Sequence, residues 1–386
     1  MASFRSLVLR SILLGLFSTL TLVSCGDAGV GKMTTARGDH AASILSNGKI
    51  LVSGGIGDWG AGQRSPAIGS SEILDLTTNS WTSASPLNHP RYGHTQTVLN
   101  DGTLLAVGGS PNGVKDLPPE IYNASNDNWT ETSKMSYARR LGHAATLMAN
   151  GEVLVTGGLA EVEGNKKIIA KAEIYNPKDG SWRLVSDMTM PREKHKAVLL
   201  NNGKVLVIGS DNEEQYVRGI TTAELYDPDN DSWTGLGQLM DEHAERFTAV
   251  LLNDGKVLVS GGGTKGRRLT PETTATMEIY DPDNATWSLV EPMTTRSWRH
   301  TATVLNDGNV LFVGNEKLSI YNTSSDSWTP IGGFSDPRGG VHAPVLLSDG
   351  RTLIIGGHDI NLDKYGGLSV RTAIDSVLVY DPALEW

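Results

Sequence analysis

Seven copies of one motif fill this chain after residue 32. Each copy starts at a histidine, or once at a phenylalanine, and places a turn glycine eight positions later, as in HAASILSNGKILVSGG from His40 and FTAVLLNDGKVLVSGG from Phe247. The turn glycines are Gly48, Gly102, Gly151, Gly203, Gly255, Gly308 and Gly350. A period of about 50 residues with four strand-like segments per period is the signature of a propeller blade. The repeat therefore predicts an all-β chain folded as a seven-bladed propeller of four-stranded antiparallel blades.

The second half of each copy also repeats. An apolar residue, a tyrosine and an aspartate or asparagine come first, as in Ile279-Tyr280-Asp281, and a polar turn and a tryptophan follow. The seven repeat tryptophans are Trp81, Trp129, Trp182, Trp233, Trp287, Trp328 and Trp386. The glycine pair, the tyrosine and the tryptophan resemble the Kelch-repeat family of propellers, within the galactose-oxidase-like central-domain superfamily, over residues 33–386. This resemblance implies a scaffold, a ligand binder or, in a few members, an enzyme.

The first residues are typical of an export signal. Arg5 and Arg10 precede a short apolar run over residues 11–23, and Leu22-Val23-Ser24-Cys25 closes it. A run this short indicates a signal h-region and not a membrane span. The sequence around Cys25 resembles the bacterial lipoprotein processing box, which implies a signal peptide over residues 1–24 and a lipid-anchored Cys25. An ordinary secretory signal is the alternative.

The lipoprotein interpretation places the protein in the bacterial cell envelope, anchored to the bilayer at the outer membrane or cell surface. Residues 25–32 then form the anchor segment, and residues 33–386 form a single propeller domain without a linker or low-complexity tract. The formal net charge of −10 argues against nucleic acid as a partner. Cys25 is the only cysteine, so no disulfide can form within the chain.

The order of strands in a blade predicts two different faces. The Asn/Asp-Gly turns between the first two strands and the short turns before each tryptophan share one face. The loops between the second and third strands share the opposite face with the connections between blades. These loops cover residues 56–71, 110–119, 159–171, 210–222, 263–276, 315–318 and 358–375. Blade six has almost no loop, and this gap could open one side of the face to a ligand.

Residues that break the repeat just before each first strand are the candidate binding site. Because the first strand is innermost, these residues ring the mouth of the central channel. Mixed charges and two aromatic residues meet there: Asp39, Tyr92, Glu193, Lys194, Glu245, Arg246, Trp298 and Arg299. An aromatic face beside charged groups suits a sugar or another partly apolar ligand. A solvated rim with charges that pair among themselves is the alternative.

Other residues at the blade starts are expected to be structural. Arginine recurs three positions before the histidine in the first four blades, as Arg37, Arg91, Arg140 and Arg192, which suggests bridges between neighbouring blades. Six of the nine histidines share one repeat position, and His89, His243 and His358 show no metal-ligand spacing. No metal or cofactor is expected.

Two functions from different classes follow. The first is a non-catalytic binding module for an unknown protein or glycan. The second is a carbohydrate-active enzyme of the sialic-acid mutarotase type, which is built around catalytic glutamate and arginine residues. Glutamates and arginines also stand at the channel mouth, namely Glu193, Glu245, Arg246 and Arg299. No motif of that family matches them residue by residue, so no catalytic residue is assigned and binding is favoured. A copper-radical oxidase of the galactose-oxidase type needs a tyrosine cross-linked to a cysteine. The only cysteine is Cys25, which the lipoprotein interpretation assigns to the anchor, so this chemistry is excluded.

The end of the chain predicts how the ring closes. Blade seven reaches Trp386 with no room for a complete fourth strand. Residues 27–34 precede Arg37 where other copies have the end of their fourth strand. We therefore expect this segment to pair into blade seven beside Tyr380 and to cover a bare sheet edge.

Overall fold

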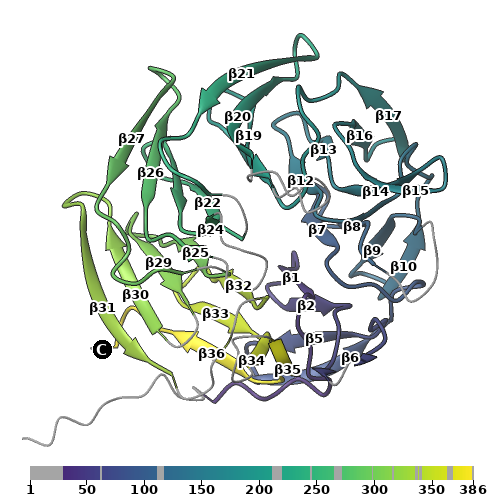
Figure 1. Ribbon diagram of the computed structural model, residues 1–386. Helices are drawn as coiled ribbons and strands as arrows, with labels where there is room; N and C mark the ends of the chain where they lie inside the picture. Colours follow the sequence, from purple (N-terminus) through teal and green to yellow (C-terminus); the bar gives the residue numbers. More distant parts are fainter. Residues whose placement is uncertain are drawn as a thin grey trace, which may run out of the picture.

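Figure 1 shows a ring of β-sheets arranged around a central axis. The computed structural model describes residues 29–60, 63–110, 117–210, 220–243, 246–264, 272–297, 299–314, 317–334, 338, 341–362 and 368–384. Every regular element in these ranges is a β-strand, and none of the described residues forms a helix that could cross a membrane. The prediction of an all-β, seven-bladed propeller is confirmed.

Each blade is an antiparallel sheet in which the strand nearest the axis comes first in the chain. Blade one contains β1 (Ala41–Ile44), β2 (Ile50–Ser53), β5 (Ser71–Asp75) and β6 (Ser80–Ala84). Blade two contains β7 (Thr95–Val98), β8 (Leu104–Val107), β9 (Glu120–Asn123) and β10 (Asn128–Glu131). Blade three contains β12 (Ala144–Leu147), β13 (Val153–Thr156), β16 (Ala172–Asn176) and β17 (Ser181–Val185). Blade four contains β18 (Lys196–Leu199), β19 (Val205–Ser210), β20 (Ile220–Asp227) and β21 (Ser232–Gln238).

The remaining blades follow the same order. Blade five contains β22 (Thr248–Leu251), β23 (Val257–Ser260), β26 (Met277–Asp281) and β27 (Thr286–Val290). Blade six contains β28 (Thr301–Val304), β29 (Val310–Val313), β30 (Lys317–Asn322) and β31 (Ser327–Gly333). Blade seven has three strands within the described residues, which are β32 (Ala343–Leu346), β33 (Thr352–Ile355) and β36 (Val377–Tyr380).

The repeat residues build the blades by pairing across strands. The second strand of every blade is an apolar run covered on both faces, as in β13, where all four residues are buried. Such a run needs neighbours on both sides, and the ring supplies them. The repeat tyrosine and tryptophan are cross-strand partners: Tyr226 is in register with Trp233, and their ring centroids lie 4.9 Å apart.

Apolar clusters between neighbouring blades form the core. Leu154 and Ile174 of blade three pack with Val205, Val207 and Tyr226 of blade four. Burial of one such side chain contributes about 1.5–3 kcal/mol. Because each blade shares its apolar residues with the next, removal of one blade would expose two clusters.

The ring closes through the N-terminal segment, although not through the predicted strand. The backbone N–H of Met33 donates to the carbonyl of Asp375 in blade seven, and that of Gly31 donates to Asn79 in blade one. Val30 and Met33 are buried in the cluster between these two blades. Residues 29–34 form no strand, so the predicted pairing beside Tyr380 is not found among them, and residues 27–28 lie outside the described residues.

Comparison with other junctions explains this form of closure. Met33 and Arg37 donate their backbone N–H groups to Asp375 and Ile374, just as Leu87 and Arg91 donate to Gly69 and Ile68. Residues 33–37 therefore occupy the place of a connection between blades, here from blade seven into blade one. Its hydrogen bonds go to Asp375 and Ile374, which precede β36, so blade seven keeps three strands within the described residues.

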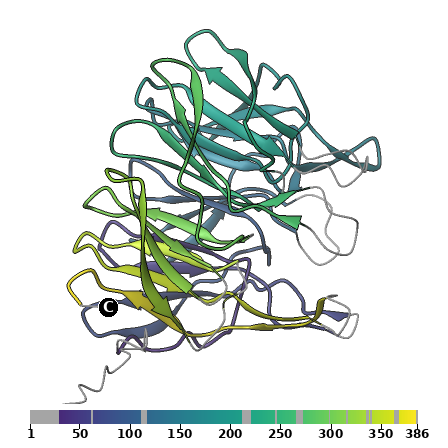
Figure 2. The same ribbon diagram turned by 60° about the vertical axis from the view of Figure 1, so that its left-hand side comes forward.

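Several loops on one face of the disc form strands of their own. These are β11 (Arg139–Leu141), β14 (Leu159–Val162) and β15 (Asn165–Ile168) at blade three, β24 (Gly263–Thr264) and β25 (Glu272–Thr273) at blade five, and β34 (His358–Leu362), β35 (Leu368–Ala373), β3 (Trp59–Gly60) and β4 (Gln63–Arg64) at blades seven and one. Figure 2 shows the yellow hairpin of blade seven and the purple strands of blade one extending together beyond the propeller body. The loops predicted from the sequence thus form raised structures on this face.

Candidate functional site

Buried arginines join the blades, as the repeat predicts. The backbone N–H of Arg192 donates to Ile169 in blade three, and its side chain reaches Glu224 in blade four at 2.7 Å. Arg37 and Arg91 make the same two kinds of contact. Each guanidinium also donates to a glycine carbonyl at the end of the second strand, such as that of Gly209. These residues are structural.

The prediction for blade three named the wrong arginine. Arg139 is buried and donates to Glu173 at 2.6 Å, which is the contact that the prediction assigned to Arg140. Arg139 lies four residues before its histidine, whereas the clamp arginines of blades one, two and four lie three residues before theirs. The strand β11 accommodates the extra residue by a register shift between Arg139 and Leu141. A bulge re-aims side chains in this way, so counting back from His143 selects the wrong position.

The glutamate of each pair completes a clamp between sheet and connection. Glu224 accepts the backbone N–H of Thr189 at 2.8 Å as well as the guanidinium of Arg192. Glu72, Glu120, Glu173 and Glu278 accept backbone N–H groups from their own connections in the same manner. In blade five His243 replaces the arginine and lies 3.2 Å from Glu278. Burial lowers the pKa of Arg192, and the charge of Glu224 opposes this effect.

The repeat histidines are also structural. Nε2 of His195 lies 2.8 Å from Oγ1 of Thr156 in the preceding blade, and His94, His143, His300 and His342 bond hydroxyl groups in the same way. Burial, followed by the charge of Arg139, lowers the pKa of His143 to about 3. These imidazoles are therefore neutral in the folded protein.

The residues that directly precede each repeat histidine or phenylalanine share one backbone conformation. All seven positions have positive φ: Asp39, Gly93, Gly142, Lys194, Arg246, Arg299 and Val341. Backbone hydrogen bonds link these positions from blade to blade, as from Gly93 to Asp39 and from Lys194 to Gly142. Because glycine, charged and apolar residues all adopt this conformation, the fold imposes it whatever the residue type. The type of side chain can therefore differ from blade to blade.

The predicted mouth residues differ in exposure. Asp39, Tyr92, Lys194 and Arg246 are half-buried, whereas Glu193 and Arg299 are buried, with 6% and 7% of their surface exposed. Glu245 and Trp298 lie outside the described residues. The backbone ring thus brings Asp39, Lys194, Arg246 and Arg299 to one circle, and a ligand at the mouth stays a prediction.

Sequence reasoning missed two features of this face. Lys196 lies on the innermost strand of blade four, where burial and the nearby charge of Arg246 lower its pKa. A lysine among the threonines and alanines at this repeat position is the signal that could have revealed it.

The second feature joins blades seven and one. The guanidinium of Arg371 lies over the ring of Trp59, 4.7 Å from its centroid, and the backbone N–H of Ala373 donates to Asp58 at 2.8 Å. His358 is buried, and its Nε2 lies 3.2 Å from the carbonyl oxygen of Gly57. Trp59 and His358, both outside the repeat, therefore fasten the last blade to the first.

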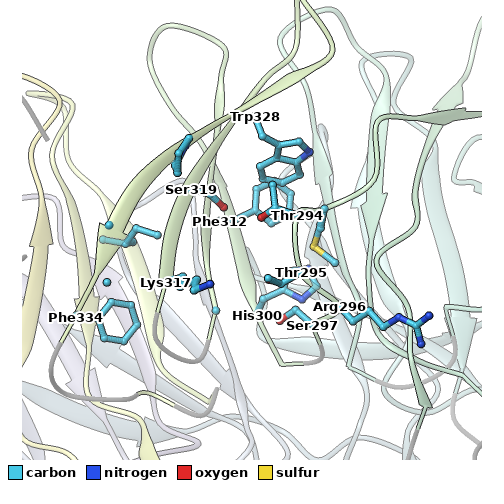
Figure 3. Close-up of a pocket in the computed structure, with 16 residues that line it drawn as sticks. Thr294, Thr295, Arg296, Ser297, His300, Phe312, Lys317, Ser319, Trp328 and Phe334 are labelled. Carbon is cyan, nitrogen blue, oxygen red and sulfur yellow. The ribbon is translucent and has the colours of Figure 1, made fainter.

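A cavity of about 980 Å³ opens at blade six (Figure 3). It lies between the connection Met293–Ser297 and the sheet, beside the shortened turn at Gly314 and Lys317. Figure 3 shows Phe312, Trp328 and Phe334 around it, with Lys317 between Phe334 and His300. The side chain of Arg296 lies to one side and extends away from the other labelled residues. The gap predicted from the missing loop thus coincides with a hollow of ligand size.

No three His, Cys, Asp or Glu side chains among the described residues are grouped closely enough to hold a metal ion. The arrangement on this face is suited to binding, through varied side chains on a rigid ring, raised hairpins and a hollow in one blade.

Known Kelch-like proteins have sequences similar to that of this chain. The human Kelch-like protein 23 is 27% identical over 220 residues, which is 56% of this chain and 36% of that protein. Kelch-like protein terF of Aspergillus terreus is 22% identical over 260 residues, 65% of this chain and 55% of its own length. This chain therefore spans about a third to a half of the length of these relatives.

A solved structure has the same fold. A fungal alcohol oxidase of the AA5 family, in complex with copper, superposes with a TM-score of 0.67 and 18% identity, covering 90% of this chain and 76% of its own. At this identity the likeness concerns the fold alone. The model of the Attractin/LZTR1 β-propeller family matches residues 27–270. The chain thus belongs to the Attractin/LZTR1 β-propeller family, within the Kelch-type propellers.

Proposed function

We propose that this protein is a non-catalytic interaction module that binds a partner protein on its loop-bearing face. The raised hairpins of blades three, five, seven and one are the observation that carries this proposal. The interiors of blades two to four repeat the same clamps, histidines and tyrosine–tryptophan pairs, whereas their loops on this face differ in length and structure. Varied loops on a rigid scaffold are the usual place for recognition. The Kelch-like relatives support a propeller that binds proteins.

Site-specific photo-cross-linking tests which face binds. Lys166 on β15 and Lys178 in a turn are both exposed and belong to the same blade, but they lie on opposite faces. With a photoreactive residue at position 166, the body from residue 26 should capture a defined partner from envelope extracts. The same residue at position 178 should not. Equal capture at both positions, or capture at position 178 alone, would contradict the proposal.

We propose that Cys25 anchors the propeller to the bilayer of a bacterial envelope. Leu22-Val23-Ser24-Cys25 supports this, and these residues lie outside the described part of the chain. A glycan remains the second ligand class for the mouth, where Trp298 would provide the stacking surface. We do not extend the proposal to sugar conversion, because no specific observation favours it.

A further inference from the structure

Blade six lacks both members of the clamp found in blades one to four. Ser319 stands at the position of the glutamate, directly before the Ile320-Tyr321 pair. Ser297 stands at the position of the arginine, since its backbone donates to Thr274 and accepts from Gly262 as Arg192 does with Ile169 and Gly158. Two short hydroxyl side chains thus replace a guanidinium and a carboxylate, and Figure 3 shows both serines at the cavity.

The loss of the clamp leaves polar backbone groups at the cavity without their usual partners. In blade one Glu72 accepts the N–H groups of Thr34 and Thr35, whose counterparts in blade six are Thr294 and Thr295. Within the described part of the chain, neither Thr294 nor Thr295 donates its N–H to a carboxylate or to another backbone group. Two adjacent donors that hold a carboxylate in other blades therefore line the hollow.

The surroundings favour a negative ligand with an apolar body. Arg296 and Lys317 are exposed at the cavity, and its described lining contains no aspartate or glutamate. Phe312, Trp328 and Phe334 supply aromatic surface. His300 contributes no charge, because it is neutral and its Nε2 bonds Ser260 at 2.9 Å. The hollow thus combines two N–H donors and two cations with an apolar wall, the usual composition of a small-ligand site.

We propose that the blade-six cavity is a carboxylate-binding site, in which an external carboxylate takes the place of the absent glutamate. The N–H groups of Thr294 and Thr295 receive the carboxylate, Arg296 and Lys317 attract it, and the aromatic side chains cover the body of the ligand. The carboxylate can come from a small organic acid or from an acidic side chain of a protein segment. The site does not depend on a partner bound to the hairpins.

Calorimetric titration of the chain with two probes tests the site. The first is 4-phenylbutyrate, a small acid, and the second is a phenylalanyl-glutamate dipeptide blocked at both ends, whose only carboxylate is on its side chain. The amide of each probe serves as its control. Binding of the first acid assigns the site to small acids, and binding of the dipeptide alone assigns it to acidic side chains. In either case the matching amide should bind about tenfold more weakly or worse.

A variant that refills the position makes the test specific. Ser319→Glu supplies an internal carboxylate at the place where five other blades have one, and it should reduce probe affinity at least about tenfold. It should also raise the melting temperature, because Thr294 and Thr295 gain an acceptor. Ser83→Glu adds the same charge at an exposed position of blade one and should leave affinity unchanged. If Ser319→Glu does not fold, shifts of the Thr294 and Thr295 amide resonances on titration of the natural chain replace it.

Three results would overturn the proposal. They are failure of both acids to bind, equal binding of acid and amide, and unchanged affinity in a folded Ser319→Glu variant. Amide shifts confined to residues away from Thr294 and Thr295 would do the same.

Discussion

Removal of one clamp carboxylate tests the energetics of the ring most directly. Glu224 is buried and accepts Nε of Arg192 at 2.7 Å, the N–H of Thr189 at 2.8 Å and its hydroxyl at 2.9 Å. Glu224→Ala leaves a guanidinium without its counter-charge in a site with no exposed surface. Breaking a buried pair from one side costs about 3–5 kcal/mol, because the remaining charge stays desolvated.

This cost translates into a measurable melting shift. Unfolding entropy is about 2.1 cal/mol/K per residue, so a body of about 350 residues loses roughly 4–7 °C in Tm if it unfolds as one unit. Replacing both partners, as in Arg192→Met with Glu224→Leu, should be less harmful than the single change, because no charge is left buried.

Thermal and urea denaturation of the variants provide the assay. The control is Asp187→Asn, which breaks a pair with Lys171 of similar length, 2.6 Å, but with 45% and 36% of the two side chains exposed. An exposed pair of this kind contributes about 1 kcal/mol or less. The reasoning fails if Glu224→Ala is no more destabilising than Asp187→Asn, or if the double variant is less stable than Glu224→Ala.

Three further predictions concern pH, closure and anchoring. Folded His143 has a pKa of about 3 against 6.5 unfolded, so its contribution is complete above pH 6.5 and is lost as the pH falls toward 3. Blade five already has phenylalanine at this repeat position, as Phe247, so His143→Phe is a suitable variant. In urea denaturation, the free energy of unfolding should fall by about 2 kcal/mol less in this variant than in the natural chain between pH 7.5 and pH 5. Deletion of residues 26–34 should lower the melting temperature by several degrees, because Val30 and Met33 are buried between blades seven and one; an unchanged melting curve would argue against closure. Cys25→Ala should release the protein from the membrane fraction of a bacterial host, and an unmodified cysteine in the intact mass of the natural mature chain would exclude the anchor.

The repeat made the fold predictable because each blade obeys local rules. A glycine turn, an apolar second strand and a tyrosine paired with a tryptophan are all set within one copy, and seven copies leave few arrangements other than a ring. The repeat histidines were correctly interpreted as structural for the same reason, since a residue needed by every blade serves the contact between blades.

Predictions that depended on counting positions were less successful. Arg139 takes the role expected of Arg140 because a bulge absorbs one residue, and no local pattern announces where a strand bulges. The N-terminal segment closes the ring as a connection, because its bonds to Asp375 and Asn79 exist only when the first and last blades meet.

The sequence by itself thus determined the propeller, its two faces and the residues that ring the channel, because these follow from the period and from strand alternation. Only the tertiary structure decided what the departures from the repeat mean. Ser297 and Ser319 match no motif in the sequence. In the folded protein they stand where other blades have the arginine and the glutamate of the clamp, and both line a cavity. Burial, bulges and vacant positions depend on neighbours that are distant in the chain, so they are settled when the blades pack.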